Sequence, residues 1–258
     1  MLFTGAEISA MLGSYLWPFV RIAAMITAMP VFSSSFIPGK VRLSLAIGIT
    51  MIVAPIVPPV PPIDALSLLG FFVVLNQMLI GIIMGFIFHL VFSAFVIGGQ
   101  IIAMQMGLGF STMIDPINGS QAPVLSMFYV LMITLFFVVL DGHLALIGLL
   151  AKSFITMPIG VGTINAADYW QMATWGSEMF KGAVLVSLPA VTALFLVNMA
   201  LGIMGRTAPQ LNIFAVGFTV TIIAGFYVLF ASLPVILAQF ELLMTAAFSV
   251  IKNIVGIF

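Results

Sequence analysis

The feature that most constrains this sequence is a stretch of about 50 residues, Ala65–Ile114, that contains no Asp, Glu, Lys or Arg. As one straight helix, this stretch would extend about 75 Å at about 1.5 Å per residue, whereas the hydrocarbon core of a bilayer is about 30 Å thick. Gly81 and Gly85 lie within it at a spacing that is typical of close helix packing. The stretch is therefore either one tilted helix with an interfacial extension or a long helix that other proteins largely bury.

The rest of the chain shares this apolar character. Of its 258 residues, 63% are hydrophobic and 5% are charged, against about half and about a quarter in soluble domains. So few charged side chains cannot cover a core with a solvated surface, which excludes a water-soluble monomer. The formal net charge is zero, which gives no basic surface for nucleic acid. We expect an all-α, multi-helix protein in contact with membrane lipid.

Hydrophobic segments of helical length follow one another along the chain, and short polar connections separate them. Apart from the long central stretch, these segments are Ile8–Phe32, Leu43–Val57, Pro123–Leu150, Ala183–Met204 and Leu211–Leu233, with a further helix after Pro234. Two of these segments flank Arg206, Pro209 and Gln210. Because proline and polar residues interrupt the apolar pattern there, the sequence predicts a helical hairpin around them.

Two regions carry polar side chains on one helical face only. Asn165 with Asp168 three residues later resembles a capping box, which predicts the start of an amphipathic helix with interfacial aromatic residues. After Pro234, polar side chains recur at i, i+4, i+8 and i+11, which predicts a helix that packs on a partner or lies at an interface. The residues of this second polar face are Glu241, Thr245, Ser249 and Lys252.

Arg21 lies near the middle of the first hydrophobic segment. A guanidinium at mid-membrane costs about 2.5 to 3.5 kcal/mol on insertion scales. We therefore expect Arg21 to face protein and to find either a carboxylate or free carbonyl groups. The alternative is a displaced helix from which the side chain reaches the membrane surface.

The stretch Gly98–Pro123 combines glycines, glutamines, methionines and an Asp-Pro turn between two hydrophobic segments. Each glycine costs a continuous helix about 1 kcal/mol, so the sequence predicts that the backbone breaks here. Non-helical backbone at membrane depth is tolerated only inside protein or along an aqueous cavity. Methionine is flexible and polarisable and can close around variable cargo. The alternative is an ordinary loop outside the membrane.

Enzymatic chemistry has little support in this sequence. Asp141 and His143 are two residues apart, a spacing that does not place two side chains on one helical face. His89 stands alone in an apolar segment, without a second metal ligand at a suitable spacing. We expect both histidines to pack within the protein, and we expect neither a catalytic site nor a cofactor or metal site.

A set of short motifs, in this order and spacing, resembles the FliR family over essentially the whole chain. The motifs are Trp17-Pro18, Arg21 and Pro30, then Gln105-Met106-Gly107, Phe110 and Asp115-Pro116, then Gly142-His143, and finally Arg206-Thr207-Ala208-Pro209-Gln210-Leu211-Asn212-Ile213-Phe214 with Gly217-Phe218. The resemblance implies a subunit of the flagellar type III export gate in the bacterial cytoplasmic membrane, at the flagellar basal body. Such a gate forms with FliP and FliQ, with FlhB and FlhA as neighbours, and passes unfolded flagellar subunits.

The same resemblance implies a division of the chain and roles for particular residues. Residues 1–182 would be similar in fold to FliP and residues 183–258 to FliQ, in a closed ring that sits largely above the membrane plane. The loop of about residues 104–122 corresponds to the plug of the family. Its candidate residues are Met104, Met106, Gly107, Phe110, Met113, Ile114 and Asp115, and the candidate structural or intersubunit residues are Arg21, Gly81, Gly85, Arg206, Pro209 and Gln210. Many relatives carry a second aromatic residue where Met113 stands.

Two other functions remain open from the sequence. One is the homologous subunit of a virulence-type secretion system, which shares the fold and the mechanism. The other is a secondary transporter with a discontinuous helix near Gly98–Pro123, a known way to build a substrate site. No inverted repeat is evident in the sequence, and ionisable groups for ion coupling are scarce. Both observations count against the transporter.

Overall fold

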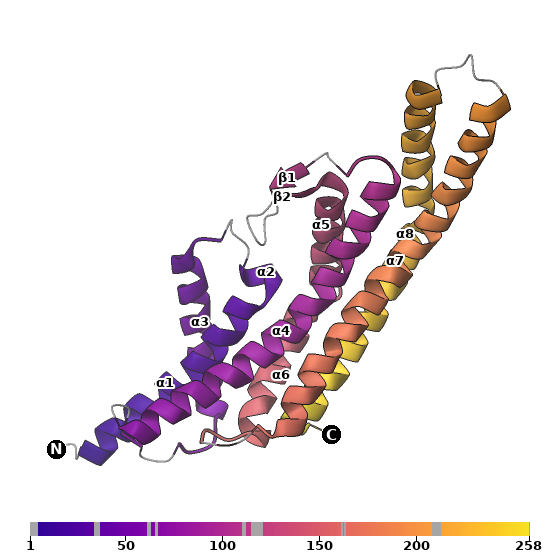
Figure 1. The fold of residues 1–258 in the computed structure, drawn as a ribbon. Helices are drawn as coiled ribbons and strands as arrows, with labels where there is room; N and C mark the ends of the chain where they lie inside the picture. Colours follow the sequence, from indigo (N-terminus) through magenta and orange to yellow (C-terminus); the bar gives the residue numbers. More distant parts are fainter. Residues whose placement is uncertain are drawn as a thin grey trace. The chain divides into compact units, whose positions relative to one another are not determined.

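The computed structural model describes residues 5–33, 37–60, 63–64, 67–109, 112–114, 121–160, 162, 164–207 and 213–257. Figure 1 shows a chain made almost entirely of helices, which confirms the predicted all-α class. Its helices are α1 (Gly5–Ala28), α2 (Pro30–Ser33), α3 (Gly39–Val53), α4 (Leu68–Gln105), α5 (Val124–Val139), α6 (Gly142–Thr156), α7 (Ala166–Thr207) and α8 (Ile213–Val255). A short 3-10 helix, η1 (Ala54–Ile56), follows α3. In the described residues, the strands are β1 (Thr112–Ile114) and β2 (Gln121–Pro123), an antiparallel pair in register Met113 to Ala122.

The helices form two compact units. The first unit comprises Met1–Leu90, Phe137–Gly176 and Thr245–Phe258, and the second unit comprises Val91–Phe136 and Ser177–Met244. Three long helices, α4, α7 and α8, contribute residues to both units. The predicted division after Gly182 falls inside α7, and the likeness of its two parts to FliP and FliQ stays a prediction.

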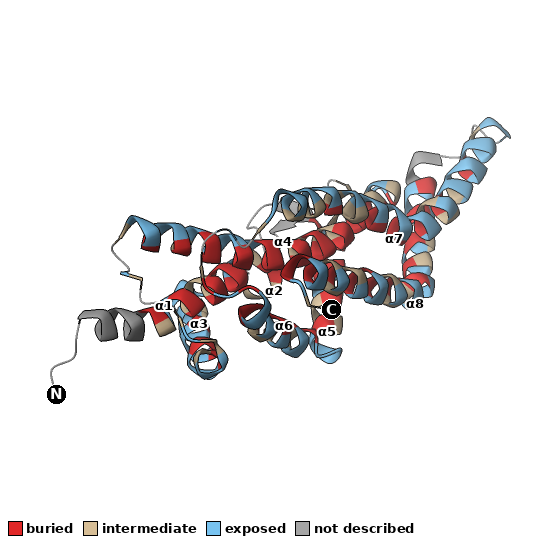
Figure 2. Ribbon diagram, turned by 90° about the horizontal axis from the view of Figure 1, so that it is seen from below, coloured by how far each residue is buried: buried red, intermediate tan, exposed pale blue. Residues whose placement is uncertain are grey.

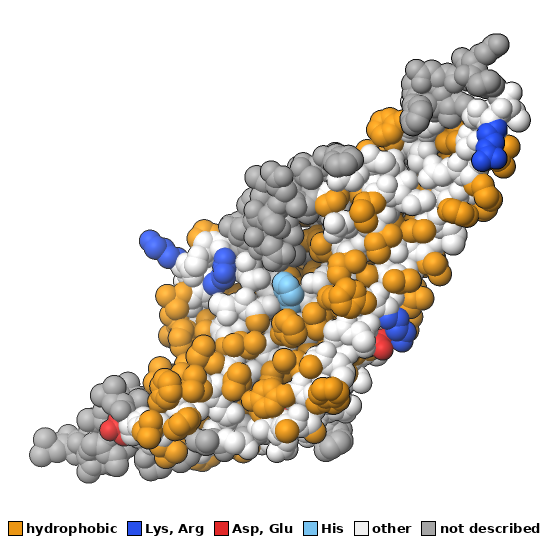
Figure 3. Space-filling model, viewed as in Figure 1, with side chains coloured by type: hydrophobic (Ala, Val, Ile, Leu, Met, Phe, Trp, Pro, Cys, Tyr) orange, Lys and Arg blue, Asp and Glu red, His pale blue; other side chains and the backbone are white. Residues whose placement is uncertain are grey.

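Several helices are long and apolar enough to cross a membrane. Among the described residues there are four such helices: α3 with η1, α4, α7 and α8. A fifth span results if α5 and α6, which meet at a bend of 65°, count as one. Figure 3 shows a face on which hydrophobic side chains are widespread and charged side chains are few. These helices confirm the prediction of a membrane protein.

The helix α4 is 38 residues long, and its own chain covers much of it. In its most hydrophobic part, 67% is buried, against 28% in the corresponding parts of α7 and α8. Figure 2 shows this contrast as many buried residues along α4, beside exposed ones on its outer face, and long exposed strips on α7 and α8. We expected other proteins to bury the long apolar helix, but for α4 the chain itself provides much of this burial. In contrast, α7 and α8 expose apolar surface.

Two helix boundaries differ from the predictions. The segment predicted as one helix from Pro123 to Leu150 breaks at Asp141, which takes a left-handed conformation with φ of 53°. Conversely, α8 continues through Pro234, where the sequence predicted a further helix, although proline removes a hydrogen bond and strains the preceding turn. Pro189 also lies inside a helix, α7, as the uninterrupted predicted segment Ala183–Met204 implies. Long apolar helices tolerate proline because neighbouring helices and Ser or Thr side chains satisfy the freed backbone groups.

Other local predictions agree with the structure. The backbone N–H of Asn165 donates to Oδ2 of Asp168 at 2.8 Å, which is one half of the predicted capping box. The polar stripe on α8 is exposed along its whole length, and Glu241 and Lys252 mark its two ends. The side of α8 that carries Ala247 and Ile251 is buried.

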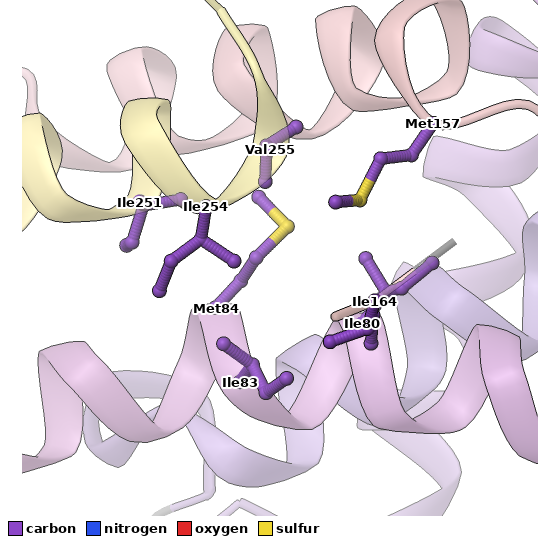
Figure 4. A pocket seen from close by; sticks show the side chains of 8 residues that line it. All are labelled: Ile80, Ile83, Met84, Met157, Ile164, Ile251, Ile254 and Val255. Carbon is purple, nitrogen blue, oxygen red and sulfur yellow. The ribbon is translucent and has the colours of Figure 1, made fainter. Parts of the chain in front are cut away.

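The core of the first unit includes a narrow apolar gap between α4 and the end of α8. Figure 4 shows Ile251, Ile254 and Val255 of α8 facing Met84 of α4, and Met157 reaching toward them from the end of α6. The remaining lining residues are Ile80, Ile83 and Ile164. The gap has no room for a water molecule and no polar side chain in its lining. It is packing space rather than a ligand site.

The predicted close packing at Gly81 and Gly85 is present between α1 and α4. A Cβ atom at Gly81 would lie 2.8 Å from Cβ of Ala24, and one at Gly85 would lie 2.7 Å from the carbonyl oxygen of Met25. These distances are shorter than real Cβ contacts allow, so only glycine permits the two backbones to approach this closely.

We expect the substitution Gly85→Leu to destabilise the first unit by about 1 to 3 kcal/mol, because a larger side chain forces α1 away from α4. The control is Gly48→Leu on α3, where a Cβ atom would meet nothing within 4 Å. The melting temperature of the detergent-solubilised protein or complex measures the effect. Equal melting temperatures for the two variants would show that this contact is unimportant.

Candidate functional site

The first candidate residue, Arg21, is fully buried in the first unit. Its Nε donates to Oε1 of Gln77 at 2.8 Å. One terminal nitrogen donates to the carbonyl oxygen of Ser153 at 2.9 Å and to its Oγ at 3.0 Å, and the other donates to the carbonyl oxygen of Met157 at 2.9 Å. The guanidinium carbon lies 4.3 Å from the centre of the Phe154 ring. Arg21 therefore joins α1 to α4 and to the carboxyl end of α6.

These contacts explain how a cation is tolerated inside an apolar protein. The last carbonyl groups of a helix have no partner within the helix and carry its partial negative charge. At the end of α6, Arg21 meets one of them, that of Met157, together with the carbonyl group of Ser153, which also accepts from the N–H of Met157. Among the described residues, no carboxylate pairs with Arg21. Of the two expected kinds of partner, the structure therefore provides carbonyl groups. The complete burial of Arg21 also excludes the alternative, in which its side chain reaches the membrane surface.

Burial also affects the ionisation of Arg21. Of the described helices, α1 is not among those long and apolar enough to cross a membrane. Desolvation lowers the pKa of Arg21 from 12.5 to about 9, so the guanidinium stays charged at neutral pH. The charge is held by hydrogen bonds and by the aromatic face of Phe154.

The helix α4 ends at the loop that the sequence singles out. Gly107 adopts a left-handed conformation with φ of 78°. Its N–H donates to the carbonyl oxygen of Met104 at 3.1 Å, and the N–H of Leu108 donates to that of Ala103 at 2.8 Å. This pair of hydrogen bonds is a Schellman motif, which requires a residue that accepts positive φ after the last turn. Gly107 thus fixes the point where the chain leaves α4.

The predicted break in the backbone therefore comes later than Gly98. Gly98 and Gly99 lie within α4 and serve close packing instead. A Cβ atom at Gly98 would lie 3.2 Å from the carbonyl oxygen of Ala183, and one at Gly99 would lie 2.8 Å from Cα of Ser126. Since packing against α5 and α7 compensates the poor helix propensity of glycine, the helix continues to Gln105.

The loop is anchored at its base by contacts within the second unit. Met106 is fully buried, and its side chain fills the space where a Cβ atom of Gly225 in α8 would stand. A ring carbon of Phe218, also in α8, lies 3.2 Å from the position of a Cβ atom on Gly107. At the other end of the loop, the hydroxyl of Ser126 in α5 donates to the carbonyl oxygen of Val96 at 3.0 Å.

An apolar cavity of about 350 Å³ adjoins the two ends of the loop in the second unit. From the loop and α5 it is lined by Leu108, Val124, Leu125 and Phe128, and from α8 by Phe226, Leu229, Phe230 and Leu233. No ionisable side chain lines it. Its chemistry suits an apolar chain or side chain rather than a charged ligand.

The other candidate plug residues are placed only in part. Met104 is exposed on the last turn of α4. Met113 and Ile114 lie in β1, where only the backbone is described. Phe110 and Asp115 lie outside the described residues.

The predicted hairpin between α7 and α8 is present. Arg206 is exposed on the last turn of α7, where a cation favours the partial negative charge of the helix end. The hydroxyl of Thr221 in α8 donates to Oδ1 of Asn198 in α7 at 3.1 Å. Pro209 and Gln210 lie outside the described residues.

Both histidines pack against aromatic rings. His89 stacks on Phe86 with 6.5 Å between ring centres, and His143 lies 6.5 Å from the ring centre of Phe137. The Nδ1 atom of His143 is buried without a hydrogen-bond partner in the described part of the chain. His143 therefore packs within the protein, but its hydrogen bonding is less complete than expected. No group of three or more metal-ligating side chains occurs among the described residues.

Sequence reasoning missed several residues that complete these contacts. Gln77 and Ser153 were unremarkable polar residues within apolar segments, and Gly225 was an isolated glycine in an apolar helix. A buried polar residue implies a polar partner, and an isolated helical glycine implies a close approach. Neither signal identifies which residue the partner is. Gln77 and Ser153 lie 56 and 132 residues away from Arg21 in the sequence.

Comparisons with known proteins identify the family and relatives of this chain. Residues 12–247 match the family described as bacterial export proteins, family 1. The chain is 38% identical over 240 residues to the flagellar biosynthetic protein FliR of Pectobacterium carotovorum subsp. carotovorum, with 93% of this chain and 92% of the relative covered. It is 36% identical to FliR of Escherichia coli strain K12 over 95% and 94% of the two chains. It is 30% identical to FliR of Bacillus subtilis strain 168 over 95% of each chain.

Proposed function

This chain belongs to the bacterial export proteins, family 1, and we propose that it is a subunit of the flagellar protein export gate. The observation that carries the proposal is identity of 36 to 38% to flagellar relatives over more than nine tenths of both chains. The long apolar helices support a place in the bacterial cytoplasmic membrane, at the flagellar basal body.

The gate forms with FliP and FliQ, and FlhB and FlhA are its neighbours. The outward apolar surfaces of α7 and α8 support this assembly, because such surfaces need lipid or protein to cover them. Residues 183–258 include most of the α7 and α8 hairpin and take the FliQ-like place, and residues 1–182 take the FliP-like place. Arg206, Pro209 and Gln210, at the turn of the hairpin, contact a neighbouring subunit.

The loop of about residues 104–122 closes the pore at rest. Phe110, Met113 and Ile114 exclude water and ions by close apolar contact, as hydrophobic constrictions in channels do. Opening displaces the loop, and unfolded flagellar subunits then pass. Methionine suits this task because it adapts to cargo of varying shape. Arg21, Gly81 and Gly85 hold the helices that support the pore.

The proposal is tested by the secretion of flagellar proteins. Removal of the gene from its host should abolish the secretion of flagellar hook and filament proteins, and a plasmid copy should restore it. Secretion by a virulence-type system in the same host should continue unchanged, which separates the two homologous functions. Normal flagellar secretion without this chain would contradict the proposal.

A further inference from the structure

We propose that Gly225 and Phe218 of α8 are positioning residues that hold the base of the closing loop through Met106 and Gly107. The inference rests on the closing role proposed above for the loop. It adds to that role a second element, α8, which sets where the loop starts. All four residues lie in the second unit.

The side chain of Met106 occupies a notch in the surface of α8, which Gly225 leaves open because it has no side chain. A Cβ atom at Gly225 would lie 2.7 Å from Cγ and 2.8 Å from Sδ of Met106. Real Cβ atoms essentially never approach other atoms this closely, so the notch exists only because residue 225 has no side chain. Met106 is also fully buried, so its side chain is enclosed by protein where it fills this notch.

The contact between Phe218 and Gly107 holds the turn itself. Gly107 is the residue with positive φ that ends α4, and one ring carbon of Phe218 lies 3.2 Å from where its Cβ atom would be. Phe218 is 53% exposed, so it covers the turn from the solvent-accessible side of this unit. Any residue larger than glycine at position 107 would meet both the unfavourable conformation and this ring.

These two contacts connect the start of the loop to α8 rather than to α4 alone. The Schellman motif sets the direction in which the chain leaves α4, and the Met106 and Phe218 contacts set the position of that exit against α8. A displacement of α8 relative to the end of α4 would therefore move the base of the loop. We infer that the hairpin of α7 and α8 controls how firmly the loop closes.

The test uses the gate complex of this chain with FliP and FliQ, produced in cells. Gly225→Leu pushes Met106 out of its notch, and the matched control is Gly202→Leu in α7, where a Cβ atom would meet nothing within 4 Å. We expect entry of a small dye to rise about tenfold in Gly225→Leu only, because overpacking a buried contact shifts an equilibrium by at least about that factor. Complex yield should match that of the control.

A second readout reports the position of the loop directly. The chain has no cysteine, so a single Met113→Cys substitution gives one thiol in this chain for a membrane-impermeant maleimide. Gly225→Leu should change the rate of labelling at this thiol, and Gly202→Leu should not. The double substitution Met106→Ala and Gly225→Leu fills the same space with a side chain from α8 instead of α4. It should return both dye entry and the labelling rate to their wild-type levels.

The outcomes separate this inference from the proposed closing role. If deletion of residues 109–120 admits dye but Gly225→Leu behaves like its control, α8 does not position the loop. If the deletion also leaves the membrane tight, the closing role itself fails. Should Gly225→Leu not assemble, Phe218→Ala replaces it, since this change removes a half-exposed ring without overpacking. Unchanged dye entry and labelling in an assembled Phe218→Ala complex would overturn the inference.

Discussion

Deletion of residues 109–120 is expected to leave the complex with FliP and FliQ assembled and to make the membrane leaky to ions and small dyes. The deletion starts after the Schellman motif at Gly107 and ends before Gln121, so α4, α5 and the contact of Met106 with Gly225 are kept. The assembled helices should therefore remain in place. If the loop closes the pore as proposed, the deletion removes only this apolar obstruction, and an open aqueous pore conducts ions readily.

A milder form of the same change is Phe110→Ala, for which Phe180→Ala is the matched control. Phe180 is an exposed phenylalanine on α7. Dye entry should rise in Phe110→Ala and stay at the wild-type level in Phe180→Ala. An intact complex with a tight membrane in both loop variants would show that another element closes the pore.

The substitution Arg21→Leu is expected to prevent assembly of the complex. It would leave the carbonyl group of Met157 and the Oε1 atom of Gln77 buried without the donors that now satisfy them, whereas the carbonyl group of Ser153 would keep its hydrogen bond from the N–H of Met157. Each buried neutral acceptor left without a donor costs about 1 to 3 kcal/mol, so the two together remove a large part of the roughly 5 to 15 kcal/mol that stabilises a typical domain. Arg21→Lys should keep part of the stability, because an ammonium group reaches fewer of the acceptors.

The control for Arg21→Leu is Lys152→Leu. Lys152 is an exposed cation on α6 and is adjacent to Ser153. The two substitutions remove the same charge and add the same side chain, but only one removes buried hydrogen bonds. The yield and melting temperature of the purified complex distinguish them. A wild-type yield and melting temperature for Arg21→Leu would show that the cluster around Arg21 adds little.

The sequence predicted features that depend on composition and local pattern. The apolar length of α4, the capping contact of Asp168 with Asn165, the exposed polar stripe from Glu241 to Lys252 and the hairpin around Arg206 are of this kind. Each depends on residues that lie close in sequence. Their physical causes, burial of an apolar face and satisfaction of helix ends, act within one helix or one turn.

The predictions of other features were wrong or incomplete, mainly because these features depend on residues that are distant in sequence. The helix α4 continues through Gly98 and Gly99 because α5 and α7 pack against these glycines, and α8 continues through Pro234. For α4 and α8, tertiary packing overrides the local propensities. The helical segment after Pro123 breaks at Asp141, directly before Gly142, so this break did have a local turn signal that the prediction of one continuous segment overlooked.

For the candidate site, the sequence identified one side of each contact. Arg21 and Met106 were predicted as important residues, but their partners Ser153 and Gly225 were not. The partner of Arg21 became visible only once the end of α6 was placed beside α1. The partner of Met106 is a residue without a side chain, so its role is defined by the neighbour that occupies its space.

Affinity purification from native membranes tests most directly whether this chain is an export-gate subunit. A tagged copy of the chain is extracted in detergent, and the co-purifying chains are identified by mass spectrometry. We expect a single discrete complex that contains FliP and FliQ, and aggregation or degradation of the chain when it is produced without them, because α7 and α8 present apolar surface that partners must cover. A stable, monodisperse homo-oligomer of this chain alone would contradict the account.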